Sequence, residues 1–365
     1  MTHLAVQPED YQQQLADKQE RLQGMLAPYT DAELDVFASP ALHYRMRAEF
    51  RVWHEGDDLY YIMFDPETRE KIRMDSFPAG SKLINALMAE LITQIKGQPV
   101  LRTKLFQVEF LTTTSGQALI SLLYHRQLDE EWEQAAQLLR RTLQGLAQVH
   151  LIGRARKQKI CIEQDWVVEE LTIAGRDYQF QQIENSFTQP NAAVNVAMVE
   201  WALAATQATD HDLLELYCGN GNFSLPLARN FNRVLATEIS KVSVASARYN
   251  CELNAIDNVT VVRMSAEDFS AVMKGEKDSR RAKEAELESF DCRTVLVDPP
   301  RAGLDADTVE LVRNYERIIY ISCNPETLVE NLESLSSTHK VVKCALFDQF
   351  PYTHHVEAGV IIEKR

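Results

Sequence analysis

Short apolar segments alternate with helical stretches after Phe187, and this alternation restricts the possible folds more than any other feature of the sequence. The apolar segments are, in order, DLLELY, RVLATEI, NVTVVRM, RTVLVDPP, RIIYISC, KVVKCALFD and EAGVIIEK. Alternation of this kind is typical of an α/β domain with a doubly wound, mostly parallel sheet. We therefore predict a Rossmann-like domain with a seven-stranded sheet over residues 185–365.

The front half of the sequence has a different pattern. From Tyr44 to about Val167, alternating segments such as MRAEFRVWHE and DLYYIMFD are interrupted by two helical stretches. This pattern predicts an α+β region with an antiparallel sheet. A polar amphipathic helix that ends at Pro28 is expected before it. Because 365 residues exceed the usual size of one domain, we divide the chain into residues 1–180 and 185–365.

Composition and charge exclude several classes of protein. The sequence has no apolar run near the ~18 residues that span a bilayer and no secretory signal at its start, so we expect a cytoplasmic protein without a membrane partner. Its six cysteines form no C-x-x-C pair and no cluster spacing, which predicts no metal and no iron–sulfur cluster. The net charge of −15 argues against extensive contact with nucleic acid, so any RNA site has to be local.

The carboxyl ends of the predicted strands are where a doubly wound sheet binds its ligand. The first strand runs into Tyr217-Cys218-Gly219-Asn220-Gly221-Asn222, whose glycines allow a tight turn and close approach to a ligand. An ordinary strand-to-helix turn has the same pattern. Glu238 ends the second strand, where a carboxylate can accept hydrogen bonds from a ribose. The turn lacks the third glycine of the dinucleotide-binding motif and the lysine of the phosphate-binding loop. The pattern therefore favours S-adenosylmethionine over NAD or ATP.

Two further strands end in residues that suggest chemistry. Asp298 begins a loop stiffened by two prolines, which either holds this side chain over the sheet edge or merely connects a strand to a helix. Cys323 ends the fifth strand, and the following Asn324 and Pro325 mark a helix start, whose partial positive charge favours a thiolate. A cysteine at this position is also often a small buried apolar residue.

Glu357 lies between the last two strands, and a hairpin there is predicted to bring it to the edge that carries Cys323. His354 and His355 precede it, and without a third metal ligand we interpret them as hydrogen-bonding loop residues. A thiolate and a carboxylate at one edge fit methylation of uracil at carbon 5. Cys323 would add to carbon 6, and a general base such as Glu357 would then remove the proton from carbon 5. The role of Asp298, at the cofactor or at the base, stays open.

Five ordered segments, SFTQPN, LELYCGNGNFSL, LVDPPRAGLD, ISCNPETL and FDQFPYTHHVE, together resemble the bacterial tRNA (uracil-5-)-methyltransferases, the RNA m5U methyltransferase family. The resemblance spans almost the whole chain. It implies a class I methyltransferase domain behind an N-terminal RNA-binding region, with Cys323 as nucleophile and Glu357 as proton abstractor. The cofactor site that follows, with the two glycines of the turn included, comprises Gln189, Tyr217, Gly219, Gly221, Asn222, Glu238 and Asp298.

The substrate implied by the resemblance is the T-loop uridine of tRNA, nucleotide 54, which becomes ribothymidine. Relatives that act on ribosomal RNA carry a front β-barrel and cluster-binding cysteines, and this sequence shows neither, so ribosomal RNA is the second alternative. A tRNA-binding or folding factor is the third. We expect the tRNA T arm as partner, T-loop-like RNAs as further substrates, and a monomer.

The target base has to be turned out of a folded loop, which requires stacking partners and phosphate contacts in the front half. The alternating arginines of HYRMRAEFR are expected to share one strand face, and LIGRARKQK forms a second basic stretch. Surface charge or pairing within the protein is an alternative for each of these residues. The RNA-binding candidates are Arg45, Arg47, Arg51, Phe106 and His125.

Overall fold

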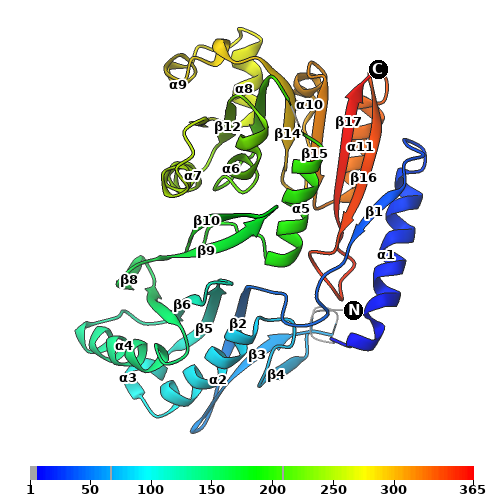
Figure 1. Ribbon diagram of the computed structural model, residues 1–365. Coiled ribbons are helices and arrows are strands. Elements are labelled where there is room, and N and C mark those ends of the chain that lie inside the picture. The colour runs from blue at the N-terminus through cyan, green and yellow to red at the C-terminus, as the bar shows by residue number, and fades with distance from the viewer. Residues whose placement is uncertain (1–5, 66–67, 208) are drawn as a thin grey trace. The chain divides into compact units, whose positions relative to one another are not determined.

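The computed structural model describes residues 6–65, 68–207 and 209–365 (Figure 1). These form two compact units. The first contains Pro40–Glu170 and Gln181–Ala192, and the second contains Asp10–Ser39, Leu171–Phe180 and Ala193–Arg365. Residues 10–39 therefore belong to the unit built mainly from the C-terminal half. Within the described ranges, none of the helices combines the length and the apolar character needed to cross a bilayer.

The first unit is built on a seven-stranded sheet in the order β4-β3-β2-β5-β6-β7-β8. Neighbouring strands are antiparallel except for β6 and β7, which are parallel and joined by the crossover helix α4. The elements are β2 (Arg47–Glu55), β3 (Asp58–Phe64), β4 (Lys71–Met74), α2 (Lys82–Lys96), α3 (Pro99–Arg102), β5 (Leu105–Thr112), β6 (Gln117–Tyr124), α4 (Glu130–Leu143), β7 (Gln148–Ala155) and β8 (Gln158–Ile162).

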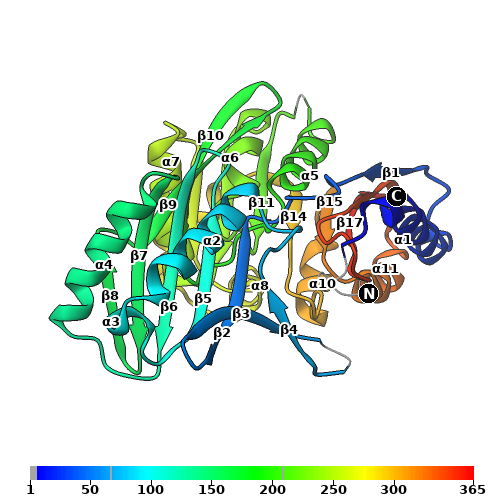
Figure 2. The ribbon, with the colours of Figure 1, turned by 90° about the horizontal axis from the view of Figure 1, so that it is seen from below.

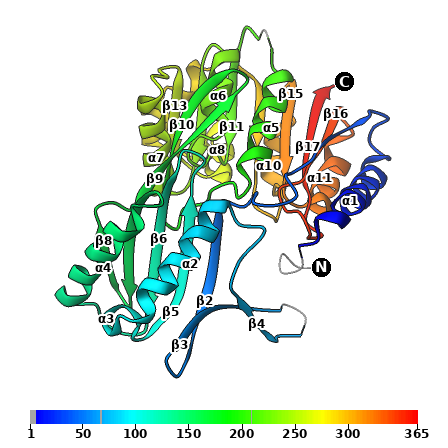
Figure 3. The ribbon, with the colours of Figure 1, turned by 60° about the horizontal axis from the view of Figure 1, so that its bottom comes forward.

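Strict alternation along β2 separates the two faces of this sheet. Ala48, Phe50 and Val52 are buried, whereas Arg51 and Trp53 between and beyond them are exposed. Side chains of successive strand residues point to opposite faces, so the apolar set faces one side of the sheet. Helices α2 and α4 contact the strands of this unit (Figure 3). Two further strands, β9 (Trp166–Ile173) and β10 (Arg176–Ile183), form a separate hairpin.

The second unit is built on one large sheet in the order β1-β16-β17-β15-β14-β11-β12-β13. All neighbouring strands are parallel except for β17, which is antiparallel to both β15 and β16. The strands are β1 (Leu34–Phe37), β11 (Asp212–Leu216), β12 (Val234–Glu238), β13 (Val259–Arg263), β14 (Cys292–Val297), β15 (Arg317–Ser322), β16 (His339–Phe347) and β17 (Glu357–Lys364). The predicted doubly wound α/β fold is confirmed.

Helices connect the strands of the second unit. Their bounds follow from local signals, since Ser240, Ser265, Asp305 and Asn324 each cap a helix by accepting a backbone hydrogen bond. The helices are α1 (Tyr11–Leu26), α5 (Ala192–Ala204), α6 (Ser224–Leu227), η2 (Ala228–Asn230), α7 (Lys241–Leu253), α8 (Ala266–Met273), α9 (Arg280–Glu284), η3 (Leu287–Ser289), α10 (Ala306–Val312) and α11 (Pro325–Leu335). The short helix η1 (Pro8–Asp10) spans the point in the sequence where the first unit ends and the second begins.

The predicted number of seven strands is wrong, because the sheet of the second unit has eight. The additional strand is β1, which precedes the first unit in the sequence and pairs in parallel with β16, Leu34 lying opposite Cys344. The rings of Phe37 and Phe347 stack across this pair with centroids 4.9 Å apart. Helix α1 contacts both β1 and α11 (Figures 1 and 2).

We predict that Gly153→Ala destabilises the first unit. A Cβ atom at Gly153 on β7 would lie 2.3 Å from a ring carbon of Trp132, a side chain of α4 with no exposed surface. Overpacking of this kind costs about 1–3 kcal/mol, which thermal and urea unfolding would measure. Gly97→Ala is the matched control, because no atom lies within 4 Å of that Cβ position. Equal stability of the two variants would contradict the packing argument.

Candidate active site

The parallel strands of the second unit end at one edge, and the candidate residues gather there. The register aligns Leu216 of β11 with Thr237 of β12 and with Val297 of β14, and Val297 in turn with Tyr320 of β15. Tyr217, Glu238, Asp298 and Cys323 stand at or just beyond these strand ends. The structure therefore brings together the side chains that the sequence predicted for this edge.

The turn after β11 requires glycine at both predicted positions. Gly219 has φ of 56° and Gly221 has φ of 88°, which is the left-handed region. A Cβ atom on Gly221 would also come within 2.3 Å of the Leu225 side chain. The amide of Asn250 donates to the carbonyl of Asn220 at 2.9 Å and fixes the turn. The turn therefore presents backbone that a ligand can approach closely.

Tyr217 adopts the left-handed conformation as well, with φ of 64°. This conformation costs of the order of 1 kcal/mol in a residue other than glycine, and such strain is concentrated at functional sites. Burial raises the pKa of the Tyr217 hydroxyl to about 12, although a hydrogen bond with Thr308 lowers it. The hydroxyl is therefore neutral at physiological pH.

Glu238 is held by the backbone around it. Its carboxylate accepts hydrogen bonds from the Gly219 N–H at 3.1 Å and from the Ser240 N–H at 2.7 Å. Each oxygen retains a further lone pair for a ligand. A fixed carboxylate beside a glycine turn fits the hydroxyls of a ribose, so the chemistry of this donor set matches S-adenosylmethionine.

The side chain of Asn222 is oriented by Asn195, a residue that no sequence motif singles out. The amides of Asn222 and Asn195 exchange two hydrogen bonds of 2.8 and 2.9 Å, and Asn195 on α5 is buried. Gln189, the remaining cofactor candidate, belongs to the first unit. The other six candidates belong to the second unit.

Cys323 and Glu357 lie next to each other because β15 and β17 are antiparallel. Ser322 pairs with Ala358, so Cys323, one residue after Ser322, and Glu357, one residue before Ala358, extend from the same end of the strand pair. The predicted hairpin placement of Glu357 at this edge is what the structure shows. The chemical roles of the two residues remain predictions.

Burial and negative charge dominate the electrostatics around these two side chains. Burial raises the pKa of Glu357 well above its ordinary value, and the nearby Asp298 raises it further. Burial also raises the pKa of Asp298. The Cys323 pKa is raised to about 11 by burial and by these two carboxyl groups, with Arg301 acting in the opposite direction. The helix start at Asn324 was expected to favour a thiolate, but the surrounding carboxyl groups and burial outweigh it.

Arg301 is a charged group at the site that the sequence analysis did not select. Its guanidinium lies 3.2 Å from Nδ1 of His355, and it lowers the pKa of both Cys323 and Glu357. Burial and neighbouring cations lower the pKa of His355 to about 4, so its neutral ring can accept from Arg301. In the part of the chain that the structure describes, no three His, Cys, Asp or Glu side chains are arranged to hold a metal ion.

Three of the five RNA-binding candidates form one column in the first unit. The rings of Phe106 and His125 stack with centroids 3.9 Å apart and an interplanar angle of 11°. The guanidinium carbon of Arg51 lies 5.6 Å from the centre of the Phe106 ring. Arg51 and His125 are exposed. The structure therefore places a cation and two flat rings together at the surface of this unit.

The other two candidates and two cations of the second basic stretch are engaged within the protein. Arg47 donates to the Ser186 carbonyl at 2.9 Å. Arg45 precedes β2, so the expectation that it shares a strand face with Arg47 is wrong, and its side chain donates to the Arg47 carbonyl at 2.8 Å. In LIGRARKQK, Lys159 forms ion pairs with Asp165 and Glu184, and Arg154 pairs with Glu184 as well. Pairing within the protein accounts for these cations.

The strand order, the glycine turn and the acidic end of β12 define a class I S-adenosylmethionine-dependent methyltransferase. Residues 10–365 match the tRNA (uracil-5-)-methyltransferase family. The chain belongs to this family, as the sequence motifs predicted.

Named relatives are similar in sequence over the full length of the chain. The chain is 64% identical, over 365 residues and 100% of both chains, to the tRNA/tmRNA (uracil-C(5))-methyltransferase of Idiomarina loihiensis. It is 58% identical, over 363 residues and 99% of both chains, to the protein of that name from Escherichia coli O157:H7. The crystal structure of Pyrococcus abyssi tRNA (uracil-54, C5)-methyltransferase in complex with S-adenosyl-L-homocysteine shares the fold, with a TM-score of 0.69, 21% sequence identity, and coverage of 96% of this chain and 83% of that one.

We predict that Glu215→Gln reduces the pH dependence of stability. Glu215 on β11 is buried and accepts a hydrogen bond from the Ser224 hydroxyl. Burial raises its pKa from 4.5 to about 8. The folded state therefore binds this proton more tightly than the unfolded state, and the resulting stability is present below pH 4.5 and lost as the pH rises through about 8.

Thermal unfolding between pH 5 and pH 8 measures this effect. A tenfold change in proton affinity corresponds to about 1.4 kcal/mol, so we expect the wild-type midpoint to fall by several degrees more than that of Glu215→Gln. Glu330→Gln changes an exposed carboxylate of α11 and serves as the control. Parallel pH profiles for wild type and Glu215→Gln would show that Glu215 does not titrate in this range.

Proposed function

We propose that the protein transfers a methyl group from S-adenosylmethionine to carbon 5 of the T-loop uridine of tRNA, nucleotide 54, and so forms ribothymidine. The observation that carries this proposal is the placement of Cys323 beside Glu357 at the edge that holds the cofactor candidates. The full-length relatives named as tRNA/tmRNA (uracil-C(5))-methyltransferases support it.

The cofactor site supplies the electrophile. Bound S-adenosylmethionine provides a methyl group on a positively charged sulfur. In this chain Glu238 would accept hydrogen bonds from the ribose, and Gly219 and Gly221 would leave room for the ligand beside their backbone. Asp298 contributes negative charge close to Cys323. Tyr217 and Asn222 would complete this set, and the family resemblance alone adds Gln189.

Cys323 acts as the nucleophile in the proposed reaction. Its thiol loses a proton to solvent, and the thiolate forms a bond to carbon 6 of the uracil, which moves an electron pair onto carbon 5. This pair would then form the bond from carbon 5 to the methyl group as the bond between the methyl group and the donor sulfur breaks. The positive charge of Arg301 favours the thiolate, whereas Glu357 and Asp298 disfavour it. The positive charge of bound S-adenosylmethionine would lower the pKa of Cys323, Glu357 and Asp298. The Cys323 thiolate therefore forms most readily when the cofactor is bound.

Glu357 completes the reaction as the general base. After methylation, its carboxylate takes the proton from carbon 5, the electron pair of that bond restores the double bond between carbons 5 and 6, and the bond from carbon 6 to sulfur breaks. Burial strengthens Glu357 as a base because it raises the pKa of the group. A base of raised proton affinity is suited to a proton bound to carbon.

The column of Arg51, Phe106 and His125 is the proposed contact to the T arm. Unstacked bases are held on aromatic rings and guanidinium planes, and these three side chains offer both. Relatives are named for tmRNA as well as tRNA, so RNAs that imitate a T loop are proposed as further substrates. We expect a monomer, because Cys323 and Glu357 come from one chain. We expect it in the cytoplasm, because the full-length relatives are named as tRNA/tmRNA-modifying enzymes.

Two variants test the mechanism. Cys323→Ala is expected to form no covalent RNA adduct and no methylated uridine, because the nucleophile is missing. Glu357→Gln is expected to accumulate a covalent, methylated adduct that resists denaturing electrophoresis. Mass spectrometry of a T-arm RNA incubated with enzyme and labelled cofactor measures both products. Methylation by Cys323→Ala, or normal turnover by Glu357→Gln without an adduct, would refute the proposal.

A second prediction concerns RNA binding. Phe106→Ala removes the ring between Arg51 and His125, and the loss of stacking on one base costs about 1–3 kcal/mol. We expect KM for tRNA to rise about 5- to 150-fold, with the affinity for cofactor unchanged. Leu138→Ala alters an exposed apolar side chain on α4 of the same unit and is the control. An unchanged KM in Phe106→Ala would remove the column from the RNA-binding surface.

A further inference from the structure

The loop from Asp348 to Val356 leads directly into Glu357 and has no helix or strand of its own. It is nevertheless packed into the second unit, since Asp348, Tyr352 and Val356 have at most 2% of their surface exposed. A loop without regular structure depends on other segments for its backbone hydrogen bonds. The position of Glu357 therefore depends on whatever holds this loop.

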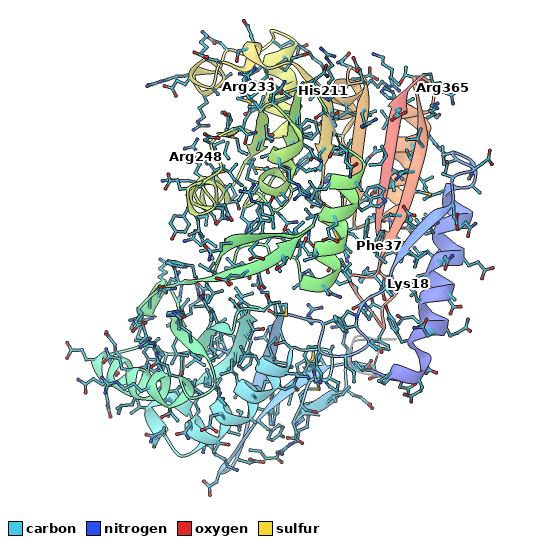
Figure 4. All side chains as sticks on the ribbon, viewed as in Figure 1. Lys18, Phe37, His211, Arg233, Arg248 and Arg365 are labelled. Carbon is cyan, nitrogen blue, oxygen red and sulfur yellow. The ribbon has the colours of Figure 1, made fainter. Side chains whose placement is uncertain are left out.

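Helix α1, more than 300 residues earlier in the sequence, supplies the main contact. The ammonium group of Lys18 lies 2.6 Å from Oδ1 of Asp348 and donates to the Phe350 carbonyl at 2.8 Å. Lys18 and Asp348 are both buried, with 5% and 0% of their side chains exposed. Figure 4 marks Lys18 on α1. The start of the loop is thus tied to α1 by a buried ion pair.

Tyr11 forms a hydrogen bond to the second carboxylate oxygen of Asp348. Its hydroxyl donates to Oδ2 at 2.9 Å and accepts from the Ser39 N–H at 2.7 Å. The backbone N–H of Asp348 donates to the Phe37 carbonyl at the end of β1 at 3.0 Å. Both oxygens and the backbone of Asp348 are therefore fixed by residues 11–39.

Two more side chains of α1 reach further along the loop. Oε1 of Gln14 accepts from the Tyr352 N–H at 2.8 Å, and Arg21 donates to the His354 carbonyl at 3.0 Å. Tyr352 has φ of 62°, so the loop holds a strained conformation at this contact. Tyr11, Gln14, Lys18 and Arg21 are spaced by three, four and three residues, which places them on one face of the helix.

We propose that this face of α1 positions the catalytic loop, so that Glu357 points at carbon 5 of the bound uracil. The inference rests on the proposed function and assigns Tyr11, Gln14, Lys18 and Arg21 as positioning residues. A buried ion pair is often no more stabilising than apolar residues of similar size, whereas it fixes the geometry of its partners. The four contacts are spread over the loop up to His354, three residues before Glu357.

The step that depends on this placement is the last one. The Glu357 carboxylate removes the carbon 5 proton, the freed electron pair forms the bond between carbons 5 and 6, and Cys323 leaves as a thiolate. Cys323 follows β15 directly, so its position does not depend on the loop. The addition of Cys323 to carbon 6 and the methyl transfer should therefore be less sensitive to the loop than the proton removal. Loss of the α1 contacts should therefore slow release of the product more than methyl transfer.

Tyr11→Phe and the double variant Lys18→Met with Asp348→Asn test this separation. Tyr11→Phe removes the two hydrogen bonds of the hydroxyl, to Asp348 and from Ser39, and leaves the ion pair. The double variant leaves no buried charge without a partner. Because small misplacements of a catalytic group can cost up to about 100-fold, we expect roughly 10- to 100-fold slower release in the double variant and a smaller effect in Tyr11→Phe. In a single turnover, methyl transfer should stay within about threefold of wild type.

Three readouts identify the slowed step. The covalent adduct should accumulate on denaturing gels as in Glu357→Gln, and uridine deuterated at carbon 5 should give a larger isotope effect on turnover than in wild type. Asp17→Asn changes an exposed residue of α1 whose side chain bonds to Gln13 and should behave as wild type. Circular dichroism and cofactor binding verify that each variant is folded.

The outcomes separate the two proposals. Equal slowing of methyl transfer and release in folded variants, or turnover like that of Asp17→Asn, would overturn the positioning role and leave the proposed function standing. Absence of an adduct in Glu357→Gln as well would mean that the proposed mechanism itself fails, and the inference would fall with it.

Discussion

The reversed direction of β17 is the constraint on which the candidate site depends. In a sheet whose strands were all parallel, the residue that begins one strand and the residue that follows another would lie at opposite edges. Because β17 is antiparallel to β15, its first residue, Glu357, lies at the edge where β15 ends in Cys323. One inverted strand therefore places a carboxyl group beside a thiol, although 34 peptide bonds separate the two residues in the sequence.

Negative charge at this edge of the sheet favours a cationic ligand over a phosphate. Burial raises the pKa of both Asp298 and Glu357, Asp298 raises that of Glu357 further, and the same two carboxyl groups disfavour the Cys323 thiolate. A cationic ligand would lower these pKa values, whereas a phosphate would raise them. An acidic chain of net charge −15 is thus consistent with a positively charged methyl donor at the sheet edge, and with a local RNA site such as the one proposed at Arg51, Phe106 and His125.

Much of this organisation can be predicted from the sequence because it follows from local patterns. Strand periodicity gave the doubly wound sheet, and the glycines and Glu238 gave an adenosine site, since each depends on a few neighbouring residues. β1 could not be predicted, because four residues become a strand only by pairing with β16, some 300 positions away. Arg45, Arg47 and Lys159 look like free cations in a sequence, and only tertiary contacts reveal their intramolecular partners.

Long-range contacts also determine the electrostatics of the candidate site. The raised pKa values of Cys323, Asp298 and Glu357 arise from burial and from the distances between charged groups, and neither quantity is encoded in a short motif. Burial and two carboxyl groups raise the pKa of Cys323, which is opposite to the effect that the helix start alone predicts. In the same way, the apolar stripe on α1 predicts a packed helix, while its polar residues determine what that helix holds. Burying the charge of Lys18 without a partner would be costly, and Asp348 supplies that partner. The position of α1 and the conformation of the loop before Glu357 therefore depend on each other.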